Sequence, residues 1–468
     1  KSVSRYFDRI TRPEQILTSL PQAINVMLDP ADCGPAVISM SQDVQGEAFD
    51  YPEIFFEETI HQIRRIYPDP NQIQKAADKL KKSKQPIIIS GGGVLYSEAE
   101  EEISAFAKKH NIPVTATVMG IGCMNKDDPY YISAIGCLGE GSSNNLATDT
   151  DLALAVGTKL GDFTTGSWTN FENENFQLVS INTSRFDTTK HRATPVVSDA
   201  KIGLQELSKA LGDWKAPDNW YQRSIEERNK WDEYVAKESG PTNQELPSYA
   251  HAVGAVYRNS DPSDIVVTAA GGLVGEVVQI WKPKELNTFE TEWGFSCMSY
   301  EISGALGIKM AKPEQDVIVF VGDGSYLLQN SDIYSSVLYD KKLIIVVCDN
   351  GGHMVINRLQ LAKGGNEYLC NLNAARATNV QFVDFEAHAK SMGANGETVK
   401  SISELEAAFK RAKESDKTYV ISMKTDGYEW LEGTAFWESP TLEVDNTEGK
   451  KSALNEFLEG KNKQRKGV

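Results

Sequence analysis

Two polar residues, Asp323 and Asn350, stand where two apolar, β-branched runs stop, and together they could bind a metal ion. Asp323 lies in VIVFVGDGS (317–325), and Asn350 lies 27 positions later in LIIVVCDNGG (343–352). Such runs are typical of buried parallel strands, and ligands of an open α/β sheet bind beyond the carboxyl ends of its strands. Carboxylate, amide and backbone carbonyl oxygens are the ligands that Mg²⁺ prefers. The two motifs therefore predict a magnesium ion that also holds phosphate groups.

The residues beside Asp323 suit an anion. Gly322 and Gly324 would let backbone N–H groups approach a diphosphate closely. Gly271 and Gly272, in the sequence TAAGG at the end of another apolar run, suit the same anion. By itself GDG is typical of a turn, and Asp-Asn-Gly is typical of a hairpin. The separation of the two motifs and their strand contexts favour one shared site.

The elements that must position these residues alternate between strand and helix patterns. In the first half of the chain, short apolar runs between helical patterns are typical of a Rossmann-like domain. These runs are QPIIIS (85–90), IPVTATV (112–118), DLALAVG (151–157) and FQLVSIN (176–182). In the second half they are DIVVTAAGG (264–272), the runs before Asp323 and Asn350, and TYVISMKT (418–425). The pattern predicts an α/β fold class with doubly wound, mainly parallel sheets.

A glycine triplet, Gly91–Gly93, follows the first of these runs and resembles a phosphate-binding turn. It lacks the GxGxxG spacing of a dinucleotide site. A structural turn between strand and helix is therefore the favoured interpretation, with a phosphate site as the alternative.

Composition divides the chain into five segments. Residues 1–60 contain a helical pattern over Pro13–Leu28 and one apolar run in Gly34–Gln45, which is too little to bury a core. They are therefore predicted to be the end of a larger domain. The remaining predicted segments are a middle domain (61–212), a helical linker (213–241), a domain that binds diphosphate and magnesium (242–440) and a charged, partly disordered tail (441–468).

The composition also disfavours several classes of function. The net charge of −17 argues against a nucleic-acid-binding role. No apolar run approaches the ~20 residues that a membrane span needs, and the polar start of the chain shows no secretory signal. The six cysteines are scattered without a CxxC pair, which favours reduced thiols in a cytoplasmic protein over a disulfide framework or a zinc site.

The GDG motif, the helix and strand that follow it, and the Asn-containing turn together resemble the cofactor fingerprint of thiamine diphosphate enzymes. The resemblance implies thiamine diphosphate and Mg²⁺ as cofactors. It implies that Asp323 and Asn350 bind the metal through side-chain oxygens and that Gly352 adds its backbone carbonyl. Asp349 departs from the family pattern, which commonly has a second Asn at that position.

The same resemblance implies the residues that contact the cofactor, which are Gly271, Gly272, Ser296, Met298, Gly324 and Ser325. The glycines and Ser325 would hold the diphosphate through N–H or hydroxyl groups. Met298 matches the apolar residue that wedges between the two cofactor rings, and the carbonyl of Ser296 would accept from the aminopyrimidine. The alternative makes Met298 a core residue at the start of a helix. Ile302–Ser303 replaces the Leu-Pro that is usual in the family.

Enzymes of this family activate the cofactor with a glutamate from a pyrimidine-binding domain, usually N-terminal and usually on the neighbouring subunit. No glutamate of this sequence matches it, since Glu14 and Glu47 lie in the wrong context. We therefore predict no catalytic residue in this chain. The chain would be an N-terminally shortened form of a longer enzyme, with residues 1–60 the remnant of that domain. A homodimer or a homotetramer is expected.

Longer stretches resemble one branch of the family. SRYFDRITRPEQILTSLPQA (4–23) and DNGGHMVINRLQ (349–360) are similar to hydrolases that cleave a C–C bond in a cyclic 1,2-diketone of inositol catabolism. This implies a small-molecule diketone as the substrate and 5-deoxy-glucuronic acid as the product. One alternative is an acetolactate-synthase-like carboligase or 2-oxo-acid decarboxylase, which GTKLGDFTTG (157–166) also resembles. Another is a non-catalytic, cofactor-binding fragment.

Overall fold

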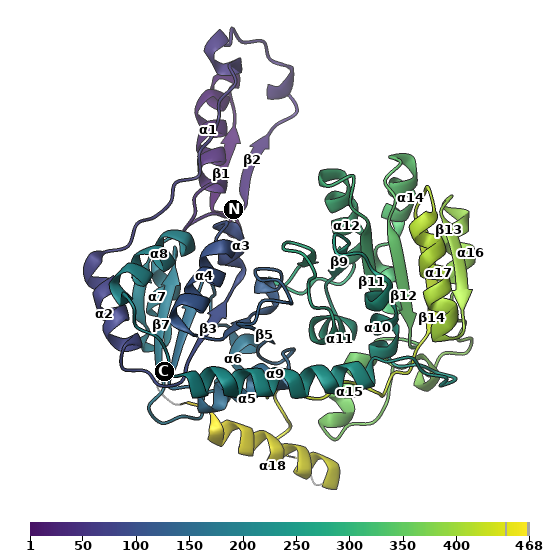
Figure 1. The fold of residues 1–468 in the computed structure, drawn as a ribbon. Coiled ribbons are helices and arrows are strands. Elements are labelled where there is room, and N and C mark those ends of the chain that lie inside the picture. The colour runs from purple at the N-terminus through teal and green to yellow at the C-terminus, as the bar shows by residue number, and fades with distance from the viewer. Residues whose placement is uncertain (445–446, 466–468) are drawn as a thin grey trace.

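The body of the chain is built on two parallel sheets that are covered by helices (Figure 1). The computed structural model describes residues 1–444 and 447–465. Each of the two large sheets has six strands, and the strand pairs within them are parallel. This architecture confirms the predicted α/β class with doubly wound parallel sheets.

The first large sheet belongs to the middle domain and has the strand order β5-β4-β3-β6-β7-β8. Its strands are β3 (Pro86–Ser90), β4 (Val114–Ala116), β5 (Tyr131–Ala134), β6 (Leu152–Val156), β7 (Gln177–Asn182) and β8 (Thr194–Val197). Its helices are α2 (Pro70–Leu80), α3 (Gly92–Tyr96), α4 (Glu100–His110), α5 (Gly141–Asp149), α6 (Asp162–Thr165), α7 (Arg185–Thr189) and α8 (Ala200–Leu211). The turn after β3 packs against the turn after β6, because the N–H of Gly93 donates to the carbonyl of Gly157 at 2.9 Å. This contact supports the structural interpretation of the glycine triplet.

The second large sheet has the strand order β10-β9-β11-β12-β14-β13. Its strands are β9 (Ile265–Thr268), β10 (Phe289–Thr291), β11 (Val317–Gly322), β12 (Ile344–Asp349), β13 (Asn395–Val399) and β14 (Tyr419–Lys424). Its helices are α10 (Tyr249–Asn259), α11 (Gly272–Ile280), α12 (Tyr300–Ala311), α13 (Asp323–Leu328), α14 (Ser331–Leu338), α15 (Met354–Ala362), α16 (Phe385–Ser391) and α17 (Ile402–Glu414). Val317–Val321 and Ile344–Cys348 are fully buried, as expected for central strands between two helical layers.

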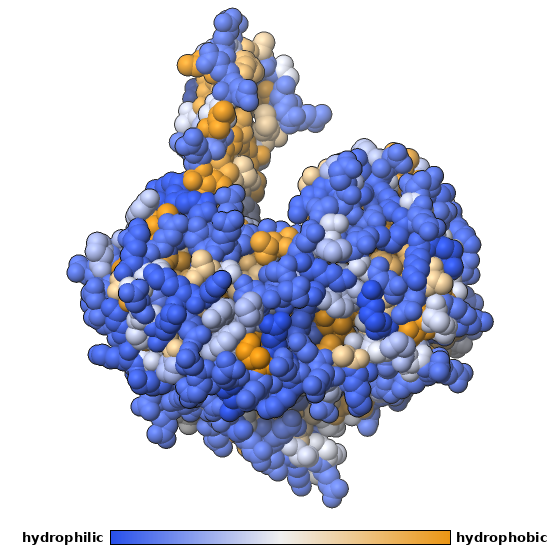
Figure 2. All heavy atoms as spheres, in the orientation of Figure 1, coloured by the Kyte–Doolittle hydropathy of each residue, from blue (hydrophilic) through white to orange (hydrophobic). Residues whose placement is uncertain are grey.

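The first 60 residues form an arm that projects from the body (Figure 1). It contains two parallel strands, β1 (Tyr6–Ile10) and β2 (Ala36–Met40), with α1 (Ile16–Met27) between them. Figure 2 shows apolar side chains on the surface of this arm, where Ile54 is 73% and Phe56 is 70% exposed. The sequence pattern did not reveal β1, because charged residues occupy the centre of that short run.

A long helix, α9 (Asp218–Glu238), runs along both domains (Figure 1). Lys282 joins it to both, since its Nζ contacts Asp232 of α9 and lies 3.6 Å from Glu140 of the middle domain. The expectation of a partly disordered tail is wrong for most of its length, because α18 spans Glu448–Lys463. Aromatic packing stabilises this helix, as a Cβ on Gly460 would lie 2.3 Å from the ring of Phe436. Residues 466–468 of the predicted tail lie outside the described residues.

The structure also bears on the expected lack of a membrane span and on the expected reduced cysteines. In the described part of the chain, no helix is long and apolar enough to cross a membrane. All six cysteines fall within the described ranges, and none of them forms a disulfide bond.

Candidate active site

The ends of three neighbouring strands bring the predicted site residues together. β9, β11 and β12 are adjacent and parallel, and the sheet grows in opposite directions from β9 and β11. Gly322 lies opposite Cys348, so Asp323 and Asn350 leave the sheet side by side at its carboxyl edge. The turn over 269–272 follows β9 at the same edge. A switch point of this kind is where open α/β sheets bind ligands.

Asp323 and Asn350 each present an oxygen that lacks a partner. Asp323 is 5% exposed, and its Oδ1, like the Oδ1 of Asn350, is buried without a hydrogen-bond donor among the described residues. Burial and, to a lesser extent, the neighbouring Asp349 carboxylate together raise the pKa of the Asp323 carboxyl to about 7. Buried oxygens without donors are costly unless a cation or a proton meets them. The pair therefore fits a metal ion.

The surroundings of this pair narrow the set of metal ligands. The Asp349 carboxylate is already paired, because it accepts from the N–H of Gly351 at 3.0 Å and lies 3.3 Å from the Nζ of Lys424. Gly352 has a φ of 138°, and a Cβ there would lie 2.4 Å from a backbone carbonyl oxygen, so glycine is required. Within the described ranges, no cluster of three or more His, Cys, Asp or Glu could hold a metal. A cation at this site would therefore combine Asp323 with amide and backbone oxygens.

Gly271 and Gly272 open α11 and leave its first turn accessible. Gly271 has a φ of 85°, and apart from its chain neighbours no heavy atom lies within 4 Å of the position of its Cβ. A Cβ on Gly272 would lie 2.1 Å from the ring of Trp430, so the turn packs directly against this side chain. The first N–H groups of a helix lack partners within it and favour an anion. The geometry is compatible with the predicted contact with a diphosphate.

Ser325 is held by a buried glutamate. Its hydroxyl donates to the carboxylate of Glu301, whose oxygens lie 3.1 and 2.9 Å away, and accepts from the N–H of Ser299 at 2.7 Å. Glu301 also accepts from the N–H of Ala270 at 3.4 Å. It thereby ties the turns after β9 and β11 to the start of α12. The Ser325 hydroxyl is therefore already hydrogen-bonded within the protein, so an anion would meet the backbone N–H of Ser325 in the first turn of α13.

Met298 lies in the turn before α12, not in the core. It is half-buried and lines the same cavity as Gly324 and Ser325. This turn has an unusual backbone, because Ser296 has a φ of 51° and Ser299 has a φ of 75°. The Ser296 hydroxyl donates to the carbonyl of Ala269 at 3.2 Å, which holds the turn against the end of β9. The position disfavours the interpretation of Met298 as a core residue, and the wedge stays a prediction.

Seven of the nine predicted site residues line one cavity of about 760 Å³ between the two domains, whereas Asp323 and Asn350 are not part of its wall. Gly271, Gly272, Ser296, Met298, Gly324, Ser325 and Gly352 all form part of its wall. The opposite wall is aromatic, because Phe163 of the middle domain lies 5.6 Å from the ring of Trp293 and 5.2 Å from that of Trp437. Among the described residues, no Asp or Glu lines this cavity. The prediction that an activating glutamate comes from elsewhere is not tested by this finding.

Comparison with protein families matches two parts of the chain. Residues 73–207 match the central domain of thiamine pyrophosphate enzymes, and residues 269–423 match their C-terminal, cofactor-binding domain. The chain belongs to the thiamine pyrophosphate enzyme family. The second match includes the turns after β9, β11 and β12, so the switch point belongs to the cofactor-binding domain of this family.

Several curated relatives of this thiamine pyrophosphate enzyme carry the name 3D-(3,5/4)-trihydroxycyclohexane-1,2-dione hydrolase. The protein from Halalkalibacterium halodurans is 37% identical over 96% of this chain and 74% of its own length. The protein from Shouchella clausii is 37% identical over 93% of this chain and 73% of its own length. The protein from Bacillus subtilis is 35% identical over 97% of this chain and 75% of its own length.

The structure adds residues that sequence reasoning did not associate with the cofactor site of this thiamine pyrophosphate enzyme. Tyr249 lines the cavity from α10, and burial raises its pKa well above the usual value, so the hydroxyl stays protonated. Trp430 packs on Gly272, and Glu301 holds Ser325. Tyr249 and Trp430 lie in no sequence motif. Only Glu301 had a local signal, as a charged residue in an otherwise small and apolar segment.

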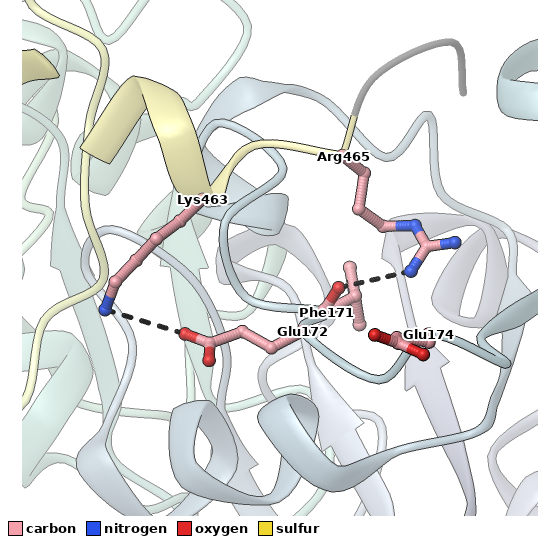
Figure 3. A pocket seen from close by; sticks show the side chains of 5 residues that line it. All are labelled: Phe171, Glu172, Glu174, Lys463 and Arg465. Carbon is pink, nitrogen blue, oxygen red and sulfur yellow. Dashed lines mark hydrogen bonds and ion pairs between the residues drawn. The ribbon is translucent and has the colours of Figure 1, made fainter. Parts of the chain in front are cut away.

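A separate cavity of about 440 Å³ lies between the middle domain and the end of α18 (Figure 3). Phe171, Glu172, Glu174, Lys463 and Arg465 line it, and it contains none of the predicted site residues. Its cations have partners within the protein. Lys463 lies 3.8 Å from the carboxylate of Glu172, and Arg465 donates to the carbonyl of Phe171 at 3.4 Å. The contacts fit a role in docking α18 rather than in binding a ligand.

Proposed function

We propose that this thiamine pyrophosphate enzyme hydrolyses 3D-(3,5/4)-trihydroxycyclohexane-1,2-dione and opens its ring to 5-deoxy-glucuronic acid, a step of myo-inositol catabolism. The observation that carries the proposal is the set of relatives with that hydrolase name, which are 33–37% identical over nearly the whole chain. The geometry is compatible with it, since the cavity is large enough for a cofactor end and a six-membered ring.

The chain's own residues would hold the cofactor and its metal. We propose Mg²⁺ bound by the side chains of Asp323 and Asn350 and the backbone carbonyl of Gly352. The buried, unpartnered Oδ1 atoms of Asp323 and Asn350 support this assignment. When bound, thiamine diphosphate supplies a nucleophilic carbon that can attack a ketone and accept the electrons of the broken C–C bond. The diphosphate would lie against the N–H groups of Gly271, Gly272, Gly324 and Ser325.

Other residues would orient the substrate and control water. The aromatic wall of Phe163, Trp293 and Trp437 offers apolar faces to the ring carbons. The protonated hydroxyl of Tyr249 can donate to a ketone oxygen, because burial holds its pKa far above neutral pH. A hydrolase must also admit one water molecule to this site, whereas a carboligase would admit a second carbonyl compound.

We also propose that the active enzyme is a homodimer or a homotetramer. The family resemblance supports this proposal, because the sites of thiamine diphosphate enzymes are usually completed by a neighbouring subunit.

Product analysis by NMR tests the proposal. The protein, supplied with thiamine diphosphate and Mg²⁺, is incubated separately with the cyclic dione and with pyruvate. An open-chain deoxy-uronic acid from the dione is the expected result. Acetolactate or carbon dioxide from pyruvate would assign the chain to the carboligases or decarboxylases. No product from either compound would point to the absent activating glutamate and favour the alternative of a cofactor-binding fragment.

A further inference from the structure

A second cavity of about 590 Å³ adjoins the cofactor cavity and shares part of its wall. Arg358, Ala362 and Thr434 line both cavities. Arg358 and Ala362 lie four residues apart on α15 and therefore on one face of that helix. The remaining wall of the second cavity consists of Asn357, Leu361, Gly427, Tyr428, Trp430, Leu431, Glu432 and Gly433. Of the three shared wall residues, only Arg358 carries a charge.

Arg358 is positioned by aromatic packing and keeps its donors free. Its guanidinium lies 5.0 Å from the centre of the Trp430 ring, which in turn packs against Gly272 and, at 5.6 Å, against Tyr249. Among the described residues, no side chain or carbonyl accepts a hydrogen bond from Arg358. The charge of the buried Glu276 acts on its guanidinium, but the two groups form no ion pair. The stack thus holds a planar cation with five N–H donors beside the turn that opens α11.

Asn357 adds a buried acceptor to the same cavity. It is fully buried, and its Nδ2 donates to the carboxylate of Glu367 at 2.8 Å. A carboxylate only accepts, so the nitrogen of the amide must face Glu367 and the oxygen must face away from it. That Oδ1 has no hydrogen-bond donor among the described residues. A buried acceptor without a donor in a cavity wall indicates a ligand that carries a hydroxyl or N–H group.

The two groups together define the chemistry of a ligand. A free guanidinium binds carboxylates through two parallel N–H bonds, and the Asn357 oxygen accepts from a hydroxyl. Glu432 is the one acid among the described residues of this wall. Its side chain is exposed, so water screens its charge. We propose that this second cavity binds the carboxylate end of an open-chain polyhydroxy acid, with Arg358 on the carboxylate and Asn357 on a hydroxyl.

This inference rests on the proposed function, because ring opening creates such an acid. Hydrolysis breaks the bond between the two carbonyl carbons of the dione. The hydroxyl of water joins one carbon to give a carboxylic acid, and a hydrogen joins the other to give an aldehyde. The substrate is neutral and the product is an anion at neutral pH. A guanidinium outside the cofactor cavity therefore favours the product and draws it away from the reacting centre.

Equilibrium binding tests the inference without turnover. The loaded enzyme is titrated calorimetrically with 5-deoxy-glucuronate and, separately, with myo-inositol as a neutral polyol. The Arg358→Gln substitution is expected to weaken binding of the uronate at least tenfold. Arg358→Lys should weaken it less, because lysine keeps the charge but loses the two parallel N–H donors of the guanidinium. The matched control, Arg376→Gln, removes an exposed arginine outside both cavities and is expected to bind like the wild type.

Two results would overturn the inference. One is unchanged uronate binding in Arg358→Gln. The melting temperature of this variant should equal that of the wild type, because the Arg358 side chain is exposed, and it shows that the variant is folded. The other is equal binding of myo-inositol and uronate to the wild type. Neither result depends on hydrolysis of the dione by the wild type, which separately tests the proposed function.

Discussion

The hydroxyl of Ser325 lies 2.9 Å from a carboxylate oxygen of Glu301, and this contact joins the turns that surround the cofactor cavity. The Ser325→Ala substitution would leave the buried carboxylate without this donor and release the N–H of Ser299. Losing a hydrogen bond to a buried charged group costs about 1–3 kcal/mol. We expect roughly tenfold weaker cofactor binding, measured by quenching of tryptophan fluorescence with thiamine diphosphate and Mg²⁺. Ser331→Ala, on the exposed start of α14, is the control, and equal affinity of both variants would refute the role of this contact.

Asp323 is expected to make cofactor binding depend on magnesium. The Asp323→Ala substitution removes the only charged ligand of the proposed site, so the affinity for thiamine diphosphate in Mg²⁺ should fall more than 100-fold. EDTA should weaken cofactor binding by the wild type to the same extent and have no further effect on the variant. Calorimetric titrations measure all four combinations, with Asp416→Ala as an exposed control.

Stability separates this effect from misfolding. The Asp323 carboxylate is buried and one of its oxygens has no donor among the described residues, so replacing it relieves an unfavourable group in the metal-free protein. Without Mg²⁺, the melting temperature of Asp323→Ala should equal or exceed that of the wild type. A large decrease would mean that Asp323 stabilises the fold rather than binds a metal.

Gly272 is expected to tolerate no side chain. A Cβ there would lie 2.1 Å from the Trp430 ring, which is rigid and packs on both Tyr249 and Arg358. Gly272→Ala should lower the free energy of unfolding by about 1–3 kcal/mol, as overpacking does, and should also weaken cofactor binding. Gly307→Ala in α12 is the matched control, since nothing lies within 4 Å of its Cβ and alanine favours a helix. Urea unfolding that finds the two variants alike would contradict the close packing.

Glu276 is expected to make stability depend on pH. Burial raises the pKa of its carboxyl to about 7, opposed by the N–H of Leu431 and the charge of Arg358. The folded state therefore keeps a proton that the unfolded chain releases near pH 4.5. This contribution to stability is fully present below about pH 4.5 and is lost as the pH rises through about 7.

The Glu276→Gln substitution isolates that contribution. An amide keeps the oxygen that accepts from Leu431 at 3.1 Å but cannot ionise. Between pH 5 and pH 8 the wild type should lose roughly 2–3 kcal/mol more unfolding free energy than the variant. Urea denaturation across this range measures the difference, and parallel curves for the two proteins would show that Glu276 titrates normally.

The amino-acid sequence by itself determined the fold class and the position of the candidate metal site. The buried strands before Asp323 and Asn350 are continuous apolar runs, and a strand that is covered on both faces has no other stable position than the centre of a sheet. The residues that follow such strands must emerge at the carboxyl edge. Local pattern and the rule of the switch point therefore sufficed to predict which turns meet.

Short strands and the last helix were harder to predict. β1 and β13 carry charged or polar residues along much of their length, so their alternation is weak. Residues of α18 are mostly charged, and the segment resembles a disordered tail in composition. Gly460 lets this helix pack closely against Phe436, and no local pattern encodes that contact.

Only the tertiary structure decided which residues complete the candidate site. Trp430 lies 158 positions after Gly272, yet its ring covers that glycine. The guanidinium of Arg358 stacks on the same ring. Phe163 reaches the cavity from a different domain. These contacts depend on how two sheets and a connecting helix pack, and such packing is a property of many weak, non-local interactions. A sequence shows the types of side chain that can do chemistry, but only the packed chain shows which of their oxygens and nitrogens are left without partners.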